Sequence, residues 1–329
     1  MVADLTAIEA SASGRMGSLS QGGFVVKIRL AFLFCLILVG APISAQELDP
    51  VAQWATIAAH EYEFIPNQVY TKASGFDLKL DVILAGPRSQ ARPTLIHIHG
   101  GGWLMGAKDG ATLVALPYLA RNMNFVNVDY RLSSTALAPA AVEDCRCALR
   151  WVYHNAKTYG FDTNRLVVTG DSAGGHLSLM TGMLDSSAGF DNVSCGWWPL
   201  EHGPFKVGAI VNYYGITDVA DLLEGTNRQD YAVAWFGSLP DRLDLARRLS
   251  PLTYVRADLP PILTFHGDAD TIVPYQHAVR LHGALDHASV PNRLVTIPGG
   301  KHGGWTRDQY FKVQQEIFAF LEKYGILSR

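Results

Sequence analysis

The stretch Arg165-Leu166-Val167-Val168-Thr169-Gly170-Asp171-Ser172-Ala173-Gly174 runs from an apolar, β-branched segment through a glycine-flanked serine into a helical pattern. The apolar run predicts a buried strand, and the small residues around Ser172 suit a tight turn from that strand into a helix. Such a turn holds the serine hydroxyl above the sheet, at the positive end of a helix dipole that favours a nearby anion. Ser172 is therefore the candidate nucleophile.

The alternation of short apolar runs and longer helical segments continues on both sides of this turn. Besides 165–169, we expect strands at 77–84, 94–99, 125–129, 207–213, 262–266 and 293–297. We expect helices at 141–157, 273–285 and 309–324. This order predicts an α/β fold in which helices cover both faces of a mostly parallel sheet.

A second glycine-rich turn, His99-Gly100-Gly101-Gly102-Trp103, follows one of the expected strands. Three consecutive glycines leave the backbone uncovered, so its amides can approach a ligand oxygen closely. A tetrahedral intermediate formed on the serine needs two or more such donors, which together make an oxyanion hole. We expect the amides of Gly101, Gly102 and Ala173 to supply them.

A nucleophilic serine needs a base that takes its proton and an acid that orients the base. The candidate base is His302, which lies in a glycine-rich loop (Gly299-Gly300-Lys301-His302-Gly303) after the last expected strand. The loop after the preceding strand, His266-Gly267-Asp268-Ala269-Asp270, offers two carboxylates. Position alone leaves the choice between Asp268 and Asp270 open.

Five motifs within about residues 75–325 resemble those of the α/β-hydrolase superfamily, in particular its bacterial hormone-sensitive-lipase-like esterases and acetyl or feruloyl esterases. They are HGGGW at 99–103, DYRL at 129–132, GDSAGG at 170–175, HGDADTIVP at 266–274 and GGKHGGW at 299–305. The resemblance implies the α/β-hydrolase fold and a Ser-His-Asp triad. It selects Asp270 as the acid, because Asp270 fills the position of the acid in the family motif and Asp268 does not.

Two inserts, residues 182–206 and 218–259, fit the alternation poorly. Long inserts between core elements are often lids or binding loops, and the resemblance implies a cap over the active site. Trp103, Trp197 and Trp198 are therefore candidate substrate-binding residues. The alternative is that such aromatic side chains pack a small core of their own.

Residues 1–45 are not expected to belong to the fold. Lys27 and Arg29 precede an apolar run from Leu30 to Ala41, and small residues follow it. This order is typical of a secretory signal peptide, so we expect cleavage after Ala45 and a secreted or periplasmic protein. The run is shorter than the roughly 20 residues that span a bilayer, so no stable membrane anchor is expected. Residues 46–329 are expected to form the α/β-hydrolase domain.

Charge and cysteine content limit the partners and the covalent cross-links. The net charge is −3, from 27 basic and 30 acidic side chains, which leaves no excess of cations for binding nucleic acid. Three cysteines follow the leader, Cys145, Cys147 and Cys195. Export permits a disulfide from Cys145 or Cys147 to Cys195, and the sequence leaves open whether either bond forms.

These features predict an exported serine carboxylesterase that hydrolyses short-chain or aryl esters, either small molecules or polysaccharide-linked, through an acyl-enzyme. The mechanism requires no organic cofactor and no metal. An arylformamidase or other amidase is an alternative, because those enzymes have similar motifs. A long-chain lipase and a catalytically inactive binding module on the same fold are further alternatives. Nothing in the sequence favours a particular oligomeric state.

Overall fold

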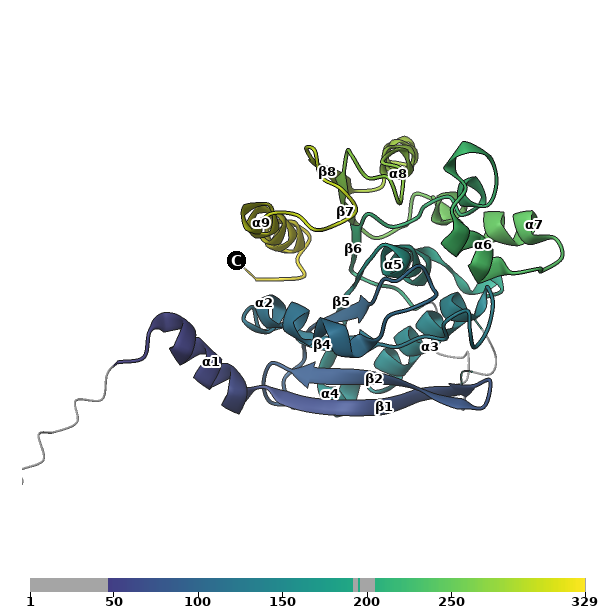
Figure 1. The fold of residues 1–329 in the computed structure, drawn as a ribbon. Coiled ribbons are helices and arrows are strands. Elements are labelled where there is room, and N and C mark those ends of the chain that lie inside the picture. The colour runs from purple at the N-terminus through teal and green to yellow at the C-terminus, as the bar shows by residue number, and fades with distance from the viewer. Residues whose placement is uncertain (1–46, 192–194, 196–204, 329) are drawn as a thin grey trace, which may run out of the picture. The chain divides into compact units, whose positions relative to one another are not determined.

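The computed structural model describes residues 47–191, 195 and 205–328. Within them, eight strands form one sheet in the order β1-β2-β4-β3-β5-β6-β7-β8 (Figure 1). The strands are β1 (Glu63–Ala73), β2 (Phe76–Leu84), β3 (Arg92–Ile98), β4 (Asn124–Val128), β5 (Phe161–Asp171), β6 (Ala209–Tyr213), β7 (Ile262–Gly267) and β8 (Asn292–Ile297). β2 pairs antiparallel with β1 and β4, and all pairs from β4 through β8 are parallel. The sheet is therefore mostly parallel, as predicted.

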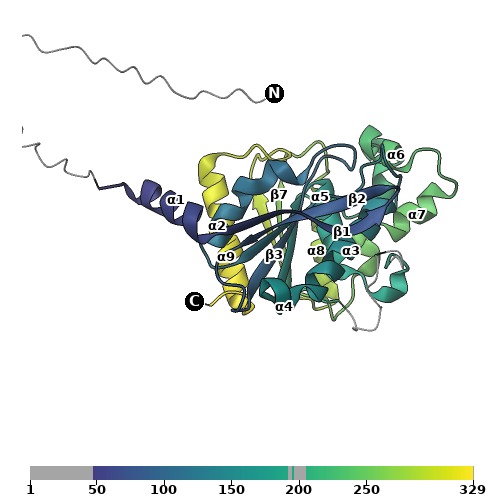
Figure 2. The same ribbon diagram turned by 90° about the horizontal axis from the view of Figure 1, so that it is seen from below.

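Helices cover both faces of this sheet (Figure 2). One face carries α3 (Ala140–His154), α5 (Ala173–Met183) and α8 (Gln276–His287), and the other carries α2 (Leu116–Leu119) and α9 (Arg307–Lys323). Along β3, Leu95 packs in the α2 and α9 layer, whereas Ile96 and Ile98 pack in the opposite layer. All residues of β3 are buried, because both faces of a central parallel strand are covered.

The other elements are short or lie outside these two layers. They are α1 (Pro50–Glu61), η1 (Lys108–Ala115), α4 (Ala156–Tyr159), η2 (Ser186–Ala188), η4 (Ala220–Leu222), η5 (Gly225–Asn227), α6 (Asp230–Phe236), α7 (Arg242–Arg248) and η6 (Pro251–Tyr254). All seven predicted strands are present with shifted ends, and the helix predicted at 141–157 is α3 followed by α4.

The strand β1 was not predicted. It lies at the edge of the sheet, and most of its side chains are exposed or half-buried. Pro66 has no amide to donate to a partner strand, and Asn67 has a φ of +57° at a shift in the pairing register. These interruptions remove the regular alternation by which a strand is recognised in a sequence.

The described part of the insert 182–206 does not cover Ser172. Its first residues complete α5, which begins at Ala173, directly after Ser172, and runs away from that serine. Phe205 and Lys206 lead into the amino end of β6. The carboxyl end of α5 and the amino ends of the parallel strands share the edge of the sheet opposite the serine. The expected cap over the site is therefore not formed by the described residues of this insert.

The structure pairs Cys147 with Cys195 in a disulfide whose Cα atoms are 5.3 Å apart. Cys145, two residues earlier on α3, is buried as a free thiol. The bond ties the insert 182–206 to α3, and it settles which of the two neighbouring cysteines is the partner of Cys195.

The predicted signal peptide and its cleavage after Ala45 lie outside the described residues. Within residues 47–191, 195 and 205–328, no helix combines the length and the apolar character needed to cross a membrane.

Candidate active site

Ser172 lies at the turn between β5 and α5, with φ +54° and ψ −120°. This strained conformation is held because the Ser172 amide donates to the carbonyl of Tyr213 (2.9 Å), at the end of the neighbouring strand. Glycine is required nearby, since a Cβ at Gly174 would lie 2.1 Å from the Ile98 carbonyl oxygen. The predicted nucleophile turn is therefore present.

His302 reaches this serine from the loop after β8, 130 residues further along the chain. Its Nε2 lies 2.8 Å from Ser172 Oγ, and its Nδ1 lies 2.7 Å from Asp270 Oδ2. A carboxylate can only accept, so Nδ1 carries the proton and donates to Asp270, which leaves Nε2 free to accept from the serine hydroxyl. The arrangement suits the transfer of the serine proton to His302.

Asp270 is buried in the loop that follows β7, and both of its oxygens have polar neighbours. Oδ1 accepts from the amides of Ile272 (2.8 Å) and Val273 (3.0 Å), and His266 Nε2 lies 3.3 Å from Oδ2. Burial acts to raise the pKa of Asp270, but the hydrogen bonds from His266, His302 and Val273 outweigh it and hold that pKa well below its usual value. The carboxylate therefore remains charged beside His302.

Asp268 occupies the other position of the pair that the sequence left open. Its Oδ1 accepts from the amide of Gly299 (2.6 Å), so it links the two loops that carry Asp270 and His302. The structure brings Asp270, and not Asp268, to the histidine, in agreement with the family motif.

The glycine turn at 100–102 lies directly against the nucleophile turn. A Cβ at Gly100 would lie 2.4 Å from Asp171 Oδ2, and the Gly101 carbonyl accepts from the amides of Leu104 and Met105 (3.1 Å each). Gly101 has φ +111°, and a Cβ there would lie 2.1 Å from the Met105 carbonyl oxygen, so only glycine fits. The loop is thus folded tightly beside Ser172.

The three amides predicted to hold an oxyanion belong to these two turns. Ala173 is the first residue of α5, and its amide therefore has no acceptor within the helix. Within the described part of the chain, the amides of Gly101 and Gly102 donate to no protein acceptor. All three remain available to an oxygen bound next to Ser172.

Trp103 does not line the site, and its prediction as a substrate-binding residue is wrong. Its side chain has no exposed surface and stacks on Trp235 of α6, with ring centroids 4.0 Å apart. Trp103 has φ +60°, and its ring packs inward against Trp235 and His176. Trp197 and Trp198, the other two predicted residues, lie outside the described residues.

A cavity of about 560 Å³ opens between the sheet and the helices α2 and α9. Its aromatic walls are Tyr118, Tyr213, Tyr214, Tyr310 and Phe311. Asp171, the neighbour of Ser172, also lines it, and the ring of Tyr214 lies 4.5 Å from the ring of His302. Thr169 places a buried hydroxyl in the lining, and that oxygen has no partner among the described residues.

The cavity lies at the point where ligands collect in α/β sheets. The connection after β3 passes over one face of the sheet and α5 passes over the other, which leaves a crevice at the carboxyl ends of these neighbouring strands. The aromatic walls could not be recognised in the sequence, because they come from separate segments and form no local motif. The contact of His266 with Asp270 was not predicted either, although that histidine opens the motif that contains Asp270.

The mostly parallel sheet with its nucleophile turn is an α/β-hydrolase fold. Residues 80–285 match the model of the BD-FAE family, and the chain belongs to that family. This membership agrees with the resemblance to hormone-sensitive-lipase-like esterases seen in the motifs.

Individual relatives with curated names include several that are named as ester hydrolases. The probable carboxylic ester hydrolase LipM of Mycobacterium tuberculosis is 30% identical over 220 residues, which are 64% of this chain and 48% of LipM. The chain spans about half the length of the curated relatives that it matches.

Two solved structures extend the likeness over most of the chain. A truncated carbohydrate esterase from gut microbiota is 28% identical with a TM-score of 0.67, covering 80% of this chain and 96% of the other. Esterase Est2 of Thermogutta terrifontis is 26% identical with a TM-score of 0.66, covering 80% and 93%.

Proposed function

We propose that the protein is a serine carboxylic-ester hydrolase that acts through an acyl-enzyme. The observation that carries this proposal is the hydrogen-bonded series from Ser172 through His302 to Asp270 at a strained strand-to-helix turn. The relatives and structural neighbours, which are named esterases, support the same chemistry.

In the acylation step, His302 Nε2 takes the proton of Ser172 Oγ while Oγ bonds to the ester carbonyl carbon. The carbonyl electron pair moves onto its oxygen, which receives hydrogen bonds from the amides of Gly101, Gly102 and Ala173. The bond to the alcohol oxygen then breaks, and His302 gives its proton to that oxygen. The charged Asp270 stabilises the imidazolium between the two proton transfers.

In the deacylation step, water takes the place of the alcohol. His302 removes one of its protons as the water oxygen bonds to the acyl carbon. The same amides hold the second oxyanion. Its collapse breaks the bond to Ser172 Oγ, which recovers its proton from His302, and the carboxylic acid leaves.

The aromatic-walled cavity supports short-chain or aryl esters as substrates. Its volume of about 560 Å³ accommodates a ring or a short acyl chain, and its lining includes Asp171, the residue before Ser172 in the chain. The carbohydrate esterase among the structural neighbours supports polysaccharide-linked esters as one substrate class.

Export is part of the proposal. It is supported by the signal-peptide pattern that ends at Ala45 and by the disulfide between Cys147 and Cys195, since disulfides persist in oxidising compartments. Expression of the full chain in a bacterial host, followed by N-terminal sequencing of the periplasmic protein, should give Gln46 as the first residue. A chain that keeps residues 1–45 and stays in the cytoplasm would contradict export.

The activity is tested with p-nitrophenyl esters of rising chain length, methyl ferulate, acetylated xylan and N-formylkynurenine. We expect turnover of the acetate to butyrate or aryl esters, loss of it in Ser172→Ala, and fluorophosphonate labelling of Ser172 alone. Cleavage of only the formamide would indicate an amidase in place of an esterase, and a preference for long chains would indicate a lipase. Absence of turnover by the wild-type protein would favour a catalytically inactive binding module.

A further inference from the structure

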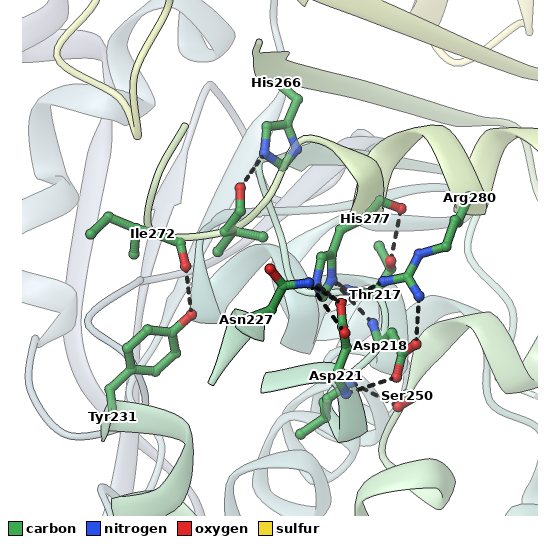
Figure 3. A network of polar contacts seen from close by, with 12 residues as sticks. Thr217, Asp218, Asp221, Asn227, Tyr231, Ser250, His266, Ile272, His277 and Arg280 are labelled. Carbon is green, nitrogen blue, oxygen red and sulfur yellow. Dashed lines mark hydrogen bonds and ion pairs between the residues drawn. The ribbon is translucent and has the colours of Figure 1, made fainter. Parts of the chain in front are cut away.

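The insert 218–259 is joined at its start to α8 by a set of ion pairs (Figure 3). Arg280 on α8 donates to Asp218 (2.9 Å) and to Asp221 (2.9 Å). His277, one turn earlier on α8, has a fully buried side chain whose Nε2 lies 3.3 Å from Asp221 Oδ2. The insert therefore begins at a fixed position on the helix that follows the Asp270 loop.

The same histidine also holds the backbone that leads into the insert. His277 Nδ1 accepts from the amides of Thr217 (3.2 Å) and Asp218 (3.3 Å), and its carbonyl accepts from the Thr217 hydroxyl (2.8 Å). Because Nδ1 accepts, the proton is on Nε2, on the side of Asp221. Backbone and side-chain contacts therefore both hold the start of the insert 218–259 against α8.

Further along the insert, Tyr231 of α6 makes two contacts that reach separate catalytic loops. A Cβ at Gly102 would lie 3.2 Å from Tyr231 Cβ and 3.3 Å from two of its ring carbons, so the ring lies directly over this glycine. The Tyr231 hydroxyl donates to the carbonyl of Ile272 (3.3 Å; Figure 3). Burial, with a smaller effect of the Asp270 charge, raises the pKa of Tyr231, so the hydroxyl keeps its proton and can donate.

These two neighbours of Tyr231 belong to different parts of the proposed active site, the oxyanion hole and the loop of the catalytic acid. The amide of Gly102 belongs to the proposed oxyanion hole, and the amide of Ile272 donates to Asp270 Oδ1 (2.8 Å). Ile272 therefore contacts both residues: its amide donates to Asp270, and its carbonyl accepts from the hydroxyl of Tyr231. A single side chain of the insert spans the loop that stabilises the oxyanion and the loop that holds the acid.

We propose that Tyr231 is a positioning residue that fixes the oxyanion loop relative to the Asp270 loop. The proposal rests on the serine hydrolase function proposed above. Its ring keeps Gly102 in the conformation in which the amide faces the oxyanion. Its hydroxyl holds the Ile272 carbonyl, which shares a peptide unit with the Val273 amide that donates to Asp270 (3.0 Å). Loss of the hydroxyl should reduce stabilisation of the transition state more than it reduces binding of the substrate, because the hydroxyl donates to a protein carbonyl and not to the substrate.

The test compares Tyr231→Phe with Tyr254→Phe. Tyr254 is a matched control, since it lies in the same insert and its hydroxyl donates to a backbone carbonyl, that of Arg248 (2.7 Å). For Tyr231→Phe we expect a fall in kcat of about threefold to tenfold, the effect of one hydrogen bond, with KM within about twofold of wild type. Tyr254→Phe should leave both constants unchanged.

A second readout separates positioning from a general loss of structure. An aryl trifluoromethyl ketone adds to Ser172 and places an oxyanion in the hole, whereas the parent methyl ketone binds without adding. In Tyr231→Phe the inhibition constant of the trifluoromethyl ketone should rise by the same factor as kcat falls, and that of the methyl ketone should stay constant. The melting temperature of each variant shows whether a fall in kcat is accompanied by a fall in stability.

The possible results are distinct. If wild type and Tyr254→Phe turn over esters and Tyr231→Phe matches them in kcat and in ketone binding, the positioning role is wrong while the esterase function stands. An equal loss in both variants, in step with melting temperature, also overturns it. If wild type neither hydrolyses esters nor binds the trifluoromethyl ketone, the proposed function fails and the role of Tyr231 fails with it.

Discussion

At the scale of single residues, two aspartates of one loop have different roles. Asp270 contacts His302, whereas Asp268 accepts a backbone amide from the neighbouring loop. We expect Asp270→Asn to lower kcat by about 10⁴-fold, the size known for the equivalent change in a serine protease triad, because His302 loses the carboxylate that fixes its tautomer. Steady-state kinetics with a p-nitrophenyl ester measures this effect.

Asp268→Asn is the control for this prediction, since it makes the same chemical change two residues away. It should lower kcat by less than about threefold, because an amide oxygen can still accept from Gly299. Equal losses in the two variants would show that the loop, and not the charge at position 270, is what activity requires.

Gly101 is the residue of the oxyanion loop with the least space for a side chain. Gly101→Ala would place a Cβ 2.1 Å from the Met105 carbonyl oxygen in a backbone that has φ +111°. The loop must therefore shift, and we expect kcat to fall by about 100-fold or more, as for loss of one oxyanion donor. Kinetics of the purified variant provides the measurement.

Gly110→Ala is the matched control, because a Cβ at Gly110 meets no atom within 4 Å and its φ is not positive. It should keep wild-type kcat within about twofold. If Gly101→Ala retains the activity of Gly110→Ala, the loop at 100–102 does not hold the oxyanion.

The sequence predicted the residues that lie in motifs and missed those that the fold assembles. Ser172 and His302 each stand in a glycine-rich loop after a strand, and parallel strands bring such loops to one edge. Trp103 stands beside the same glycines, but the backbone turns its ring into the core, and no local pattern indicates that direction. Tyr231 reaches the site only because α6 packs there.

At the scale of elements, the central strands were predictable and the edge strand β1 was not. The strands β3, β4 and β7 are buried along their whole length and contain several apolar residues each, whereas β1 is largely exposed and is interrupted at Pro66 and Asn67. The insert 218–259 was recognisable by its length, but its junction with α8 depends on ion pairs between Arg280 and two aspartates 59 and 62 residues earlier.

The disulfide is the element-scale feature with the largest expected effect on stability. It joins residues separated by 48 positions, for which the loss of loop entropy in the unfolded chain corresponds to about 4 kcal/mol. Reduction with dithiothreitol should therefore lower the free energy of unfolding in urea by an amount of that order. Activity at 25 °C should persist, because the described part of the insert is remote from Ser172.

Three single variants test the pairing. Cys195→Ala should be insensitive to dithiothreitol, whereas Cys145→Ala should keep the full effect of reduction, because Cys145 is a free thiol. An effect of dithiothreitol that disappears in Cys145→Ala and persists in Cys147→Ala would contradict the pairing.

At the scale of the whole molecule, buried histidines connect stability to pH. Burial lowers the pKa of His176 to about 4, and burial together with Arg280 lowers the pKa of His277 to about 4. In the unfolded chain both regain a pKa of about 6.5. Between these values the unfolded state binds more protons than the folded state, so the free energy of unfolding falls as the pH falls.

The loss should amount to about 3 kcal/mol for each of these histidines between pH 6.5 and pH 4. Asp270 acts in a lower range: its folded pKa is depressed, so its contribution is present above about pH 4 and is lost only as the pH falls further. Urea denaturation from pH 7 to pH 4 should therefore show a decline caused by the histidines.

His176→Leu isolates one of them. The variant is expected to be less stable at neutral pH, since it loses the hydrogen bond from His176 Nε2 to the Leu249 carbonyl, but the slope of stability against pH should decrease by up to about one proton. His287→Gln, at the exposed end of α8, is the comparison variant, because it removes a histidine that is not buried. Because the slope counts protons, it is independent of the overall loss of stability, and an unaltered slope in His176→Leu would mean that His176 does not contribute to the acid sensitivity.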